Sequence, residues 1–514
     1  MKKRRNILLI TADQWRGECL SILGHPCLRT PVLDALCGEG TLFSRHYSPA
    51  TPCGPSRASL FTGLYMHNHR SFVNGTPLDA GHANLALETR KAGYDPVLFG
   101  YTDISADPRC YAPEDPALKS YEGILPGMTL VVELDGGFRA WRADLKDKGY
   151  DVPKDPLAIF RTRSDYPDAG ERGPTYAPAL YAAEHSSTAF LSREAIKYIS
   201  THDGPWFVHL SYYSPHPPFV APEPYHDMYD PADVPAPIRA ETPEKEAEQH
   251  PWIAHYLYNQ QGTAFTYGYN SAEHNLTLGE KETRQLRATY YGMMSEVDAQ
   301  IGRLFEFLKE TGVYDETLVI FTSDHGDQLG DHWAYAKYAY FDQTFRVPLI
   351  IRDPAPDADG ARGRIVDAFT ESIDIMPTIL EWLGIEMPRE CDGRSLLSFC
   401  RGATPEGWRS EAHGELDFRN FTDRDGHPVF GLAPNQCTLS TIRDERYKYV
   451  HFSALPPLFF DLEKDPGEFH NLADDPAYRD LVVDYAQKML SWRMQHNESC
   501  LTHLRLTPEG VVRY

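Results

Sequence analysis

The sequence predicts an α/β protein with a mostly parallel central sheet flanked by helices, and a smaller α+β region at its C-terminal end. Two observations lead to this prediction. Short apolar runs alternate with helical patterns through most of the chain, and such alternation is typical of a parallel sheet with helices on its faces. From about Gly384 onward, the pattern changes to strand-like runs followed by one helix.

Five apolar runs are expected to form strands, and each one ends in polar residues. They are Asn6–Ala12, Tyr94–Tyr101, Pro205–Tyr213, Thr317–Ser323 and Val347–Arg352. Four polar or aromatic side chains come just at or past predicted strand ends, namely those of Asp13, Tyr101, His216 and Asp324. Ligands of parallel sheets bind beyond the carboxyl ends of the strands. A functional site is therefore expected at this edge.

The clearest helix prediction is Tyr290–Gly312, where six apolar residues recur on one helical stripe. In the C-terminal part, Arg443–Phe452 and Leu458–Leu462 are expected to be antiparallel strands, followed by a helix over about Leu481–Gln495. These expectations divide the chain into a catalytic α/β domain, residues 1–383, and a smaller α+β domain with an oligomerisation tail, residues 384–514.

Two long segments show no regular pattern. They are Ser105–Gly173 and the proline-rich stretch from Pro215 to about Asn275. Loops of this length are usually functional or lie at interfaces. We expect both segments to be irregular.

The composition limits the classes of function. A chain of 514 residues with 42% hydrophobic and 24% charged residues is expected to be globular and large enough for two domains. Its net charge of −23 argues against nucleic acid or an anionic membrane surface as a partner. No apolar run approaches the length that spans a membrane.

The cysteines indicate the compartment. There are nine, an odd number, and no two form a Cys-x-x-Cys pair. This usage fits a reducing environment better than a disulfide framework or a zinc site. The apolar stretch that begins at Ile7 is too short for a signal peptide and is followed at once by Asp13. We expect a cytoplasmic protein.

The most informative motif is Cys53–Gly63, which reads Cys-Gly-Pro-Ser-Arg-Ala-Ser-Leu-Phe-Thr-Gly. Pro55 near its start and Gly63 at its end are typical helix boundaries, so one interpretation is a structural helix with a buried free cysteine. The other follows from its resemblance to the signature of the type I sulfatases. In that family the cysteine of Cys-x-Pro-Ser-Arg is oxidised to formylglycine, whose hydrate is the nucleophile.

A second motif directly follows a predicted strand. Residues 322–332 read Thr-Ser-Asp-His-Gly-Asp-Gln-Leu-Gly-Asp-His, which a polar, glycine-rich turn could also explain. Asp324 and His325 would nevertheless place a carboxylate and an imidazole beside Asp13 and Gln14 of the first strand. Oxygen ligands favour Mg²⁺, Ca²⁺ or Mn²⁺, and the imidazole favours Mn²⁺ among these. Together with Cys53, these residues predict a site for one divalent metal ion.

The resemblance extends along the whole chain. Besides these motifs, the late string Phe460–Leu472 is similar to sulfatases, a family within the alkaline phosphatase superfamily. The resemblance implies an alkaline-phosphatase-like fold. Most sulfatases have Asp at the position of Gln14, and many have Asn at the position of His325. In both features the chain is similar to the bacterial phosphonate monoester hydrolases and their arylsulfatase relatives. Their metal is commonly manganese.

The resemblance also implies roles for individual residues. The metal ligands would be Asp13, Gln14, formylglycine-53, Asp324 and His325. The residues around the substrate anion would be Arg57, Asn74, Tyr101, His216 and Lys337, with Arg57, His216 and Lys337 acting in catalysis beside Cys53. Asp103 stands where the subfamily is expected to have Thr, so it bears on which ester is preferred.

These residue types support a mechanism for ester hydrolysis. The metal would acidify one hydroxyl of the formylglycine hydrate, which attacks sulfur or phosphorus in line. Arg57 could hold the nucleophile or a non-bridging oxygen. His216 or Lys337 could protonate the leaving oxygen, a role worth about 10²–10⁴ in rate. The adduct then breaks its own C–O bond, whatever its central atom, so activity on several ester types is expected.

The sequence therefore predicts a metal-dependent hydrolase of small anionic esters. We favour sulfate monoesters as the main substrates, with phosphonate monoesters and phosphate diesters as further activities. The alternative is a phosphonate monoester hydrolase and phosphodiesterase. A transferase or mutase of the same superfamily, or a non-catalytic metal-binding relative, is less favoured. A formylglycine-generating system is an expected partner, and the tail Leu504–Tyr514 suggests a homodimer or homotetramer.

Overall fold

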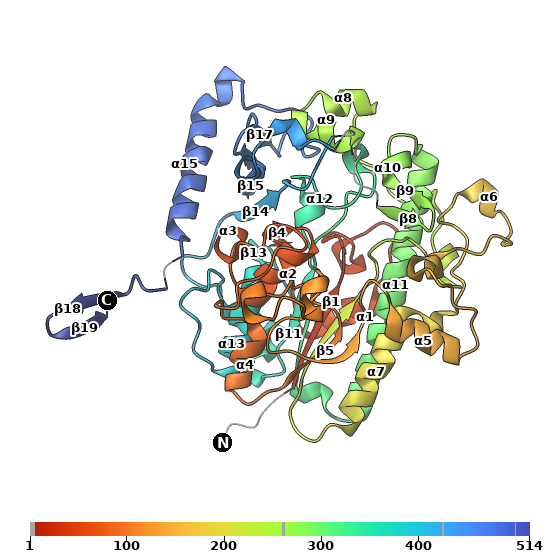
Figure 1. The fold of residues 1–514 in the computed structure, drawn as a ribbon, viewed down its shortest axis with the longest axis horizontal. Coiled ribbons are helices and arrows are strands. Elements are labelled where there is room, and N and C mark those ends of the chain that lie inside the picture. Colours follow the sequence, from red (N-terminus) through yellow and green to blue (C-terminus); the bar gives the residue numbers. More distant parts are fainter. Residues whose placement is uncertain (1–5, 260–262, 424–425, 499, 514) are drawn as a thin grey trace.

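The computed structural model describes residues 6–259, 263–423, 426–498 and 500–513. It confirms the predicted architecture of a large, mostly parallel sheet between helices and a smaller antiparallel sheet in the C-terminal part (Figure 1). Among the described residues, every helix is too short or too polar to cross a lipid bilayer.

The central sheet has eight strands, in the order β12-β2-β11-β10-β1-β7-β5-β6. Their bounds are β1 Asn6–Ala12, β2 Thr41–Phe43, β5 Pro96–Gly100, β6 Thr129–Glu133, β7 Phe207–Tyr212, β10 Thr317–Thr322, β11 Leu349–Arg352 and β12 Arg364–Val366. The run β10-β1-β7-β5-β6 is parallel. β11 is antiparallel to both of its neighbours.

Residues of β1 alternate between the two faces of the sheet, as strand geometry requires. Leu8 and Ile10 belong to one apolar cluster, and Ile7 and Leu9 to the other. The first cluster includes residues of α1 Pro31–Glu39, α5 Arg139–Asp147, α7 Ser187–Thr201 and α11 Glu280–Glu310. The second includes residues of α2 Cys53–Thr62, α4 Leu85–Lys91, α13 Ile375–Leu383 and α14 Leu397–Cys400. Both faces of β1 are therefore covered by helices.

The smaller sheet has the order β17-β16-β15-β14-β4. Four of its strands are antiparallel and come from the C-terminal part: β14 Ala412–Asp417, β15 Thr438–Arg443, β16 Tyr447–Phe452 and β17 Leu458–Asp461. The fifth, β4 Ala50–Thr51, comes from the segment just before Cys53 and pairs in parallel with β14. α15 Arg479–Gln495 packs on this sheet. The division into domains near residue 383 stays a prediction.

Three sequence predictions of secondary structure were wrong in detail. The helix predicted from Tyr290 begins at Glu280, because residues such as Thr283 and Leu286 of its first turns are also buried. The strand predicted over Arg443–Phe452 begins only at Tyr447, because Arg443 is the last residue of β15 and residues 444–446 form the turn of the β15–β16 hairpin. Its turn is stabilised by Asp444, whose carboxylate accepts hydrogen bonds from the backbone N–H groups of Arg446 and Tyr447 at 2.9 Å each.

The third error concerns the segments expected to be irregular. The segment 105–173 contains β6 and α5, and also α6 Ala169–Arg172. The segment 215–275 contains α8 Pro243–Ala247, α9 Pro251–Tyr258, β8 Ala264–Thr266, β9 Tyr269–Asn270 and α10 Ser271–His274, while its residues 260–262 lie outside the described residues. The remaining short elements are α3 Met66–His69, α12 Asp342–Phe345, β3 His46–Tyr47 and β13 Thr370–Glu371.

The C-terminal tail forms a hairpin of β18 Leu504–Thr507 and β19 Gly510–Arg513. It lies apart from the body of the molecule in Figure 1, and Tyr514 lies outside the described residues. The proposed role of this tail in subunit contacts, and the homodimer or homotetramer, stay predictions.

Candidate active site

Four of the predicted metal ligands meet at the carboxyl edge of the central sheet. Asp13 follows β1, Asp324 and His325 follow the adjacent strand β10, and Cys53 begins α2. One ligand atom from each of these buried residues lies within 4.8 Å of the other three. The prediction that the ends of parallel strands bring these side chains together therefore agrees with their positions.

The electrostatics of this cluster fit a cation. Burial raises the pKa of Asp13, and the neighbouring Asp324 raises it further. Asp13 Oδ1 is buried and has no hydrogen-bond partner among the described residues. Burial lowers the pKa of His325 to about 4, so its imidazole is neutral, which is the form that binds metals. A divalent cation would relieve the carboxylate repulsion and occupy the free oxygen.

Gln14, the fifth predicted ligand, directs its side chain to other partners. Its Oε1 accepts a hydrogen bond from Lys337 Nζ at 2.8 Å, and its Nε2 donates to the buried carboxylate of Asp327. Its backbone N–H donates to Asp324 Oδ1 at 3.1 Å. Gln14 therefore connects the carboxylates to Lys337 in this structure, and its role as a ligand stays a prediction.

Arg57 lies behind the two carboxylates and is 1% exposed. Its guanidinium donates to Asp324 Oδ2 at 2.9 Å and to Asp13 Oδ2 at 3.1 Å. Its Nη1 donates to the backbone carbonyl oxygen of Tyr101 and to the hydroxyl of Ser211. In contrast to the sequence prediction, Arg57 is not among the residues that line the cavity. Its contacts orient the carboxylates.

Lys337 joins Cys53, the predicted nucleophile, to His216. Its Nζ lies 3.2 Å from Cys53 Sγ, the atom that the formylglycine oxygens are predicted to replace, and 3.1 Å from His216 Nε2. Although burial lowers the pKa of Lys337, Cys53 and Asp13 raise it above its ordinary value on balance. Burial and then Lys337 hold the pKa of His216 well below its ordinary range. Lys337 is therefore charged and His216 neutral.

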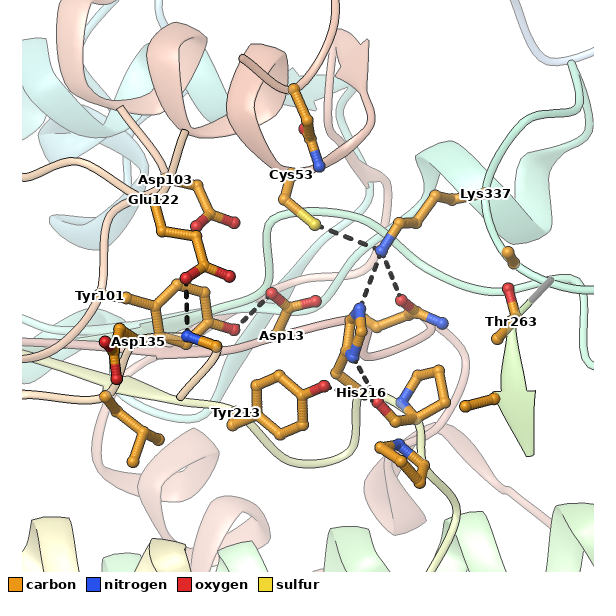
Figure 2. Close-up of a pocket in the computed structure, with 18 of the residues that line it drawn as sticks. Asp13, Cys53, Tyr101, Asp103, Glu122, Asp135, Tyr213, His216, Thr263 and Lys337 are labelled. Atoms are coloured by element: carbon orange, nitrogen blue, oxygen red, sulfur yellow. Dashed lines mark hydrogen bonds between the residues drawn. The ribbon is translucent and has the colours of Figure 1, made fainter. Parts of the chain in front are cut away.

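The proton positions of His216 follow from its neighbours. Because the Lys337 ammonium can only donate, His216 Nε2 accepts. The other ring nitrogen, Nδ1, then carries the proton and donates to the carbonyl oxygen of Pro217 at 2.6 Å. Figure 2 shows Lys337 directed at both Cys53 and His216.

A cavity of about 510 Å³ opens in front of this cluster. The predicted substrate-binding residues Asn74, Tyr101 and Asp103 all line it. Asn74 Oδ1 accepts a hydrogen bond from Gly54 N at the start of α2, at 2.9 Å. The hydroxyl of Tyr101 donates to Asp13 Oδ2 at 2.5 Å. The catalytic and binding roles of these residues stay predictions.

Several lining residues were missed by the sequence reasoning. Tyr213 follows β7 and lines the cavity, and Glu122 and Phe138 line it from the segment expected to be irregular. Asp327, which holds Gln14, belongs to the motif at 322–332 and could have been found there because it lies three residues past Asp324. Glu122 had no such signal beyond the length of its loop.

The comparisons with known proteins agree with this geometry. The family profile described as Sulfatase matches residues 5–385, and one described as N-sulphoglucosamine sulphohydrolase, C-terminal, matches residues 330–495. The chain is 47% identical to the multifunctional alkaline phosphatase superfamily protein PehA of Trinickia caryophylli, over 99% of both chains. It is 28% identical to an arylsulfatase of Clostridium perfringens, over 97% of this chain and 96% of that one.

Solved structures show the same relationship. The phosphonate monoester hydrolase of Agrobacterium radiobacter is 44% identical, with a TM-score of 0.94 over 99% of this chain and 100% of that one. The phosphonate monoester hydrolase of Silicibacter pomeroyi is 40% identical, with a TM-score of 0.90 over 99% of both. This chain therefore belongs to the sulfatase family of the alkaline phosphatase superfamily and is a hydrolase.

Proposed function

We propose that this protein hydrolyses phosphonate monoesters as its main reaction, with phosphate diesters and sulfate monoesters as further substrates. The observation that carries the proposal is the end-to-end similarity to two phosphonate monoester hydrolases. The arylsulfatase relative has a much lower identity. The sequence pattern favoured sulfate as the main substrate, and the relatives favour its alternative.

The metal would be held by Asp13, Cys53 in its formylglycine form, Asp324 and His325, with Gln14 as a further candidate. When bound, a divalent cation supplies Lewis acidity to an oxygen of the ester group and favours ionisation of a hydroxyl beside it. We propose Mn²⁺, because the set combines carboxylates with one neutral imidazole.

The nucleophile would be Cys53 after conversion to formylglycine by a generating system of the cell. The hydrated aldehyde supplies a hydroxyl at the position of Sγ. This position lies at the start of α2, where the helix dipole favours negative charge. The N–H of Gly54 is already held by Asn74 Oδ1 at 2.9 Å.

Lys337 is the proposed proton donor to the leaving oxygen. It is charged and lies within hydrogen-bonding distance of the nucleophile position. The neutral His216 accepts from Lys337 and is anchored at Pro217, so we assign it the role of directing the ammonium. Proton donation of this kind usually increases the rate by a factor of about 10²–10⁴.

The charges around the cavity support a singly charged substrate. Lys337 is the cationic side chain among the described lining residues, whereas Asp13, Asp103 and Glu122 are acidic. A second negative charge on the substrate would face these carboxylates, which is unfavourable in a buried site. Phosphonate monoesters, phosphate diesters and sulfate monoesters carry one charge each, so all three are compatible.

The proposal is tested with three substrates that share one leaving group: the 4-nitrophenyl esters of phenylphosphonate, of sulfate and of methyl phosphate. The value of kcat/KM should be highest for the phosphonate. The Cys53→Ala variant, measured beside the native protein, should lose nearly all activity on each. A higher kcat/KM for the sulfate ester would overturn the assignment of the main substrate.

A further inference from the structure

One side of the active-site cavity is built from carboxylates and aromatic rings. This acidic wall consists of Asp103, Tyr121, Glu122, Phe138 and Tyr213, all of which line the cavity. Figure 2 shows Asp103 and Glu122 on the side of Tyr101, with Lys337 on the other side of Cys53. The two ends of the cavity therefore differ in charge.

The carboxylate of Asp103 is buried and makes no direct ion pair with a described residue. Asp103 is 7% exposed, and among the described residues its side chain has no hydrogen-bond or ion-pair partner. Burial raises its pKa to about 7; the Arg57 guanidinium lowers the pKa, while Asp13 and Glu122 raise it further. A buried carboxylate without a partner is costly, so this side chain is poised to receive a cation from the cavity.

Glu122 adds a second carboxylate that lacks a cationic partner among the described residues. It accepts a hydrogen bond from the backbone N–H of Gly136 at 2.6 Å, which is a neutral donor. The nearby Asp135 is different, because Arg139 neutralises it with an ion pair at 2.7 Å. Asp103 and Glu122 are thus the carboxylates of the wall that lack a direct ion pair among the described residues.

Aromatic rings complete the wall. The rings of Phe138 and Tyr213 are 5.1 Å apart and nearly perpendicular, and Tyr121 lies beside Glu122 with 48% of its surface exposed. The faces of aromatic rings attract organic cations, most strongly where water is excluded. Carboxylates without a direct ion pair beside aromatic rings therefore match an ammonium group on an organic chain.

We propose that the acidic wall binds an ammonium group on the substituent that stays attached to phosphorus, which makes aminoalkylphosphonate monoesters the substrate class. The inference rests on the proposed function, in which Lys337 protonates the leaving oxygen at the opposite side of the cavity. The retained substituent then faces the wall. A sulfate monoester has no such substituent, so the wall would contribute nothing to its binding.

The test uses two 4-nitrophenyl phosphonate monoesters of equal length, the 3-aminopropylphosphonate and the butylphosphonate. They share the leaving group and differ by an ammonium in place of a methyl group. For the native protein, kcat/KM should be about tenfold higher for the aminopropyl ester, as expected for a cation held by a partly desolvated carboxylate and rings. Asp103→Asn should bring the ratio of the two values close to one, and Glu122→Gln should lower it.

Asp135→Asn is the matched control, because Arg139 already neutralises this carboxylate, and its ratio should equal that of the native protein. Since each ratio compares two substrates on one protein sample, partial misfolding of a variant cancels. Equal values for the two esters on the native protein, or an unchanged ratio in Asp103→Asn, would overturn the role of the wall and leave the proposed function intact. Hydrolysis of the sulfate ester alone would overturn both.

Discussion

Arg57 shows how one buried side chain can organise the site without lining the cavity. It connects Asp13, which follows β1, with Asp324, which follows β10, and its guanidinium lies 4.3 Å from the centre of the Tyr101 ring. Arginine suits this position because its planar group has several donors in fixed directions. A residue that orients metal-binding carboxylates acts on the metal through them.

Replacing Arg57 by lysine should therefore weaken metal binding. Lysine keeps the charge but cannot reach both carboxylates and Ser211 together, and changes in groups that orient ligands typically cost about 10–100-fold in metal affinity. Titration of the metal-free protein with Mn²⁺ by calorimetry measures this affinity. The control is Arg409→Lys, a largely buried arginine that pairs with two carboxylates, Asp374 and Glu371, away from the site. Native affinity in Arg57→Lys would contradict the prediction.

At the scale of single residues, the sequence located those that follow strand ends. Asp13, Asp324 and His325 come together because β1 and β10 are adjacent and parallel, and this adjacency is what the strand pattern predicted. The sequence could not predict that Asp103 lacks a direct hydrogen-bond or ion-pair partner. Whether it has one depends on which side chains the segment around Glu122 places beside it, and that segment has no periodic pattern.

Among the elements, α11 carries a buried carboxyl group that contacts a second helix. Glu296 accepts a hydrogen bond from the hydroxyl of Ser186, the residue that caps α7. Burial raises the pKa of Glu296 from its ordinary value of 4.5 to about 7. The folded protein therefore keeps this proton up to a higher pH than the unfolded chain does.

This difference predicts a pH-dependent stability. As the pH rises from 4.5 to 7, the unfolded chain releases the proton of Glu296 while the folded protein still holds it, so the folded state loses stability over this range. Glu296→Gln removes the effect, which amounts to about 3 kcal/mol by pH 8. The melting temperature of Glu296→Gln minus that of the native protein should be larger at pH 8 than at pH 5.

The exposed Glu306 on the same helix provides the control. Glu306→Gln should change the melting temperature by the same amount at both values of pH, because its side chain is in water in both states. An equal difference at pH 5 and pH 8 for Glu296→Gln would show that the buried proton does not contribute.

The sequence predicted elements well where a pattern was long and poorly where it was short. Strands β1, β7 and β10 agree closely with expectation because continuous apolar runs mark strands buried on both faces. α5 was missed because only Trp141 and Leu145 of its nine residues are buried, which is too few to establish a helical period. The charged turn at 444–446 was overlooked because the β-forming residues Tyr447, Tyr449 and Val450 follow it directly.

Across the whole molecule, the metal would connect segments that are distant in the sequence. Its proposed ligands come from β1, from the start of α2 and from the loop after β10. Binding to the folded state alone stabilises a protein by RT ln(1 + [L]/Kd), about 2.7 kcal/mol at a hundredfold excess over Kd. Mn²⁺ should therefore raise the melting temperature of the protein, and removal of metal by a chelator should lower it.

Asp324→Asn should abolish the rise in melting temperature caused by Mn²⁺. The matched control is Asp298→Asn, which removes a buried carboxylate that caps α1 far from the site, at 2.8 Å from Leu33 N; this variant should keep the rise. If Asp324→Asn still responds to Mn²⁺ like the native protein, the metal binds elsewhere.

The pairing of β4 with β14 also has a consequence for the order of events during synthesis. Ala50 and Thr51, just before Cys53, complete their hydrogen bonds only when Glu415 and Leu416 have been made. At ordinary rates of synthesis, that delay is roughly 20–70 s. In the finished fold Cys53 is 4% exposed and every residue of α2 is buried. The small sheet can therefore be completed only late in synthesis. If Cys53 is modified as proposed, it would stay accessible to the modifying system while the chain is still being made.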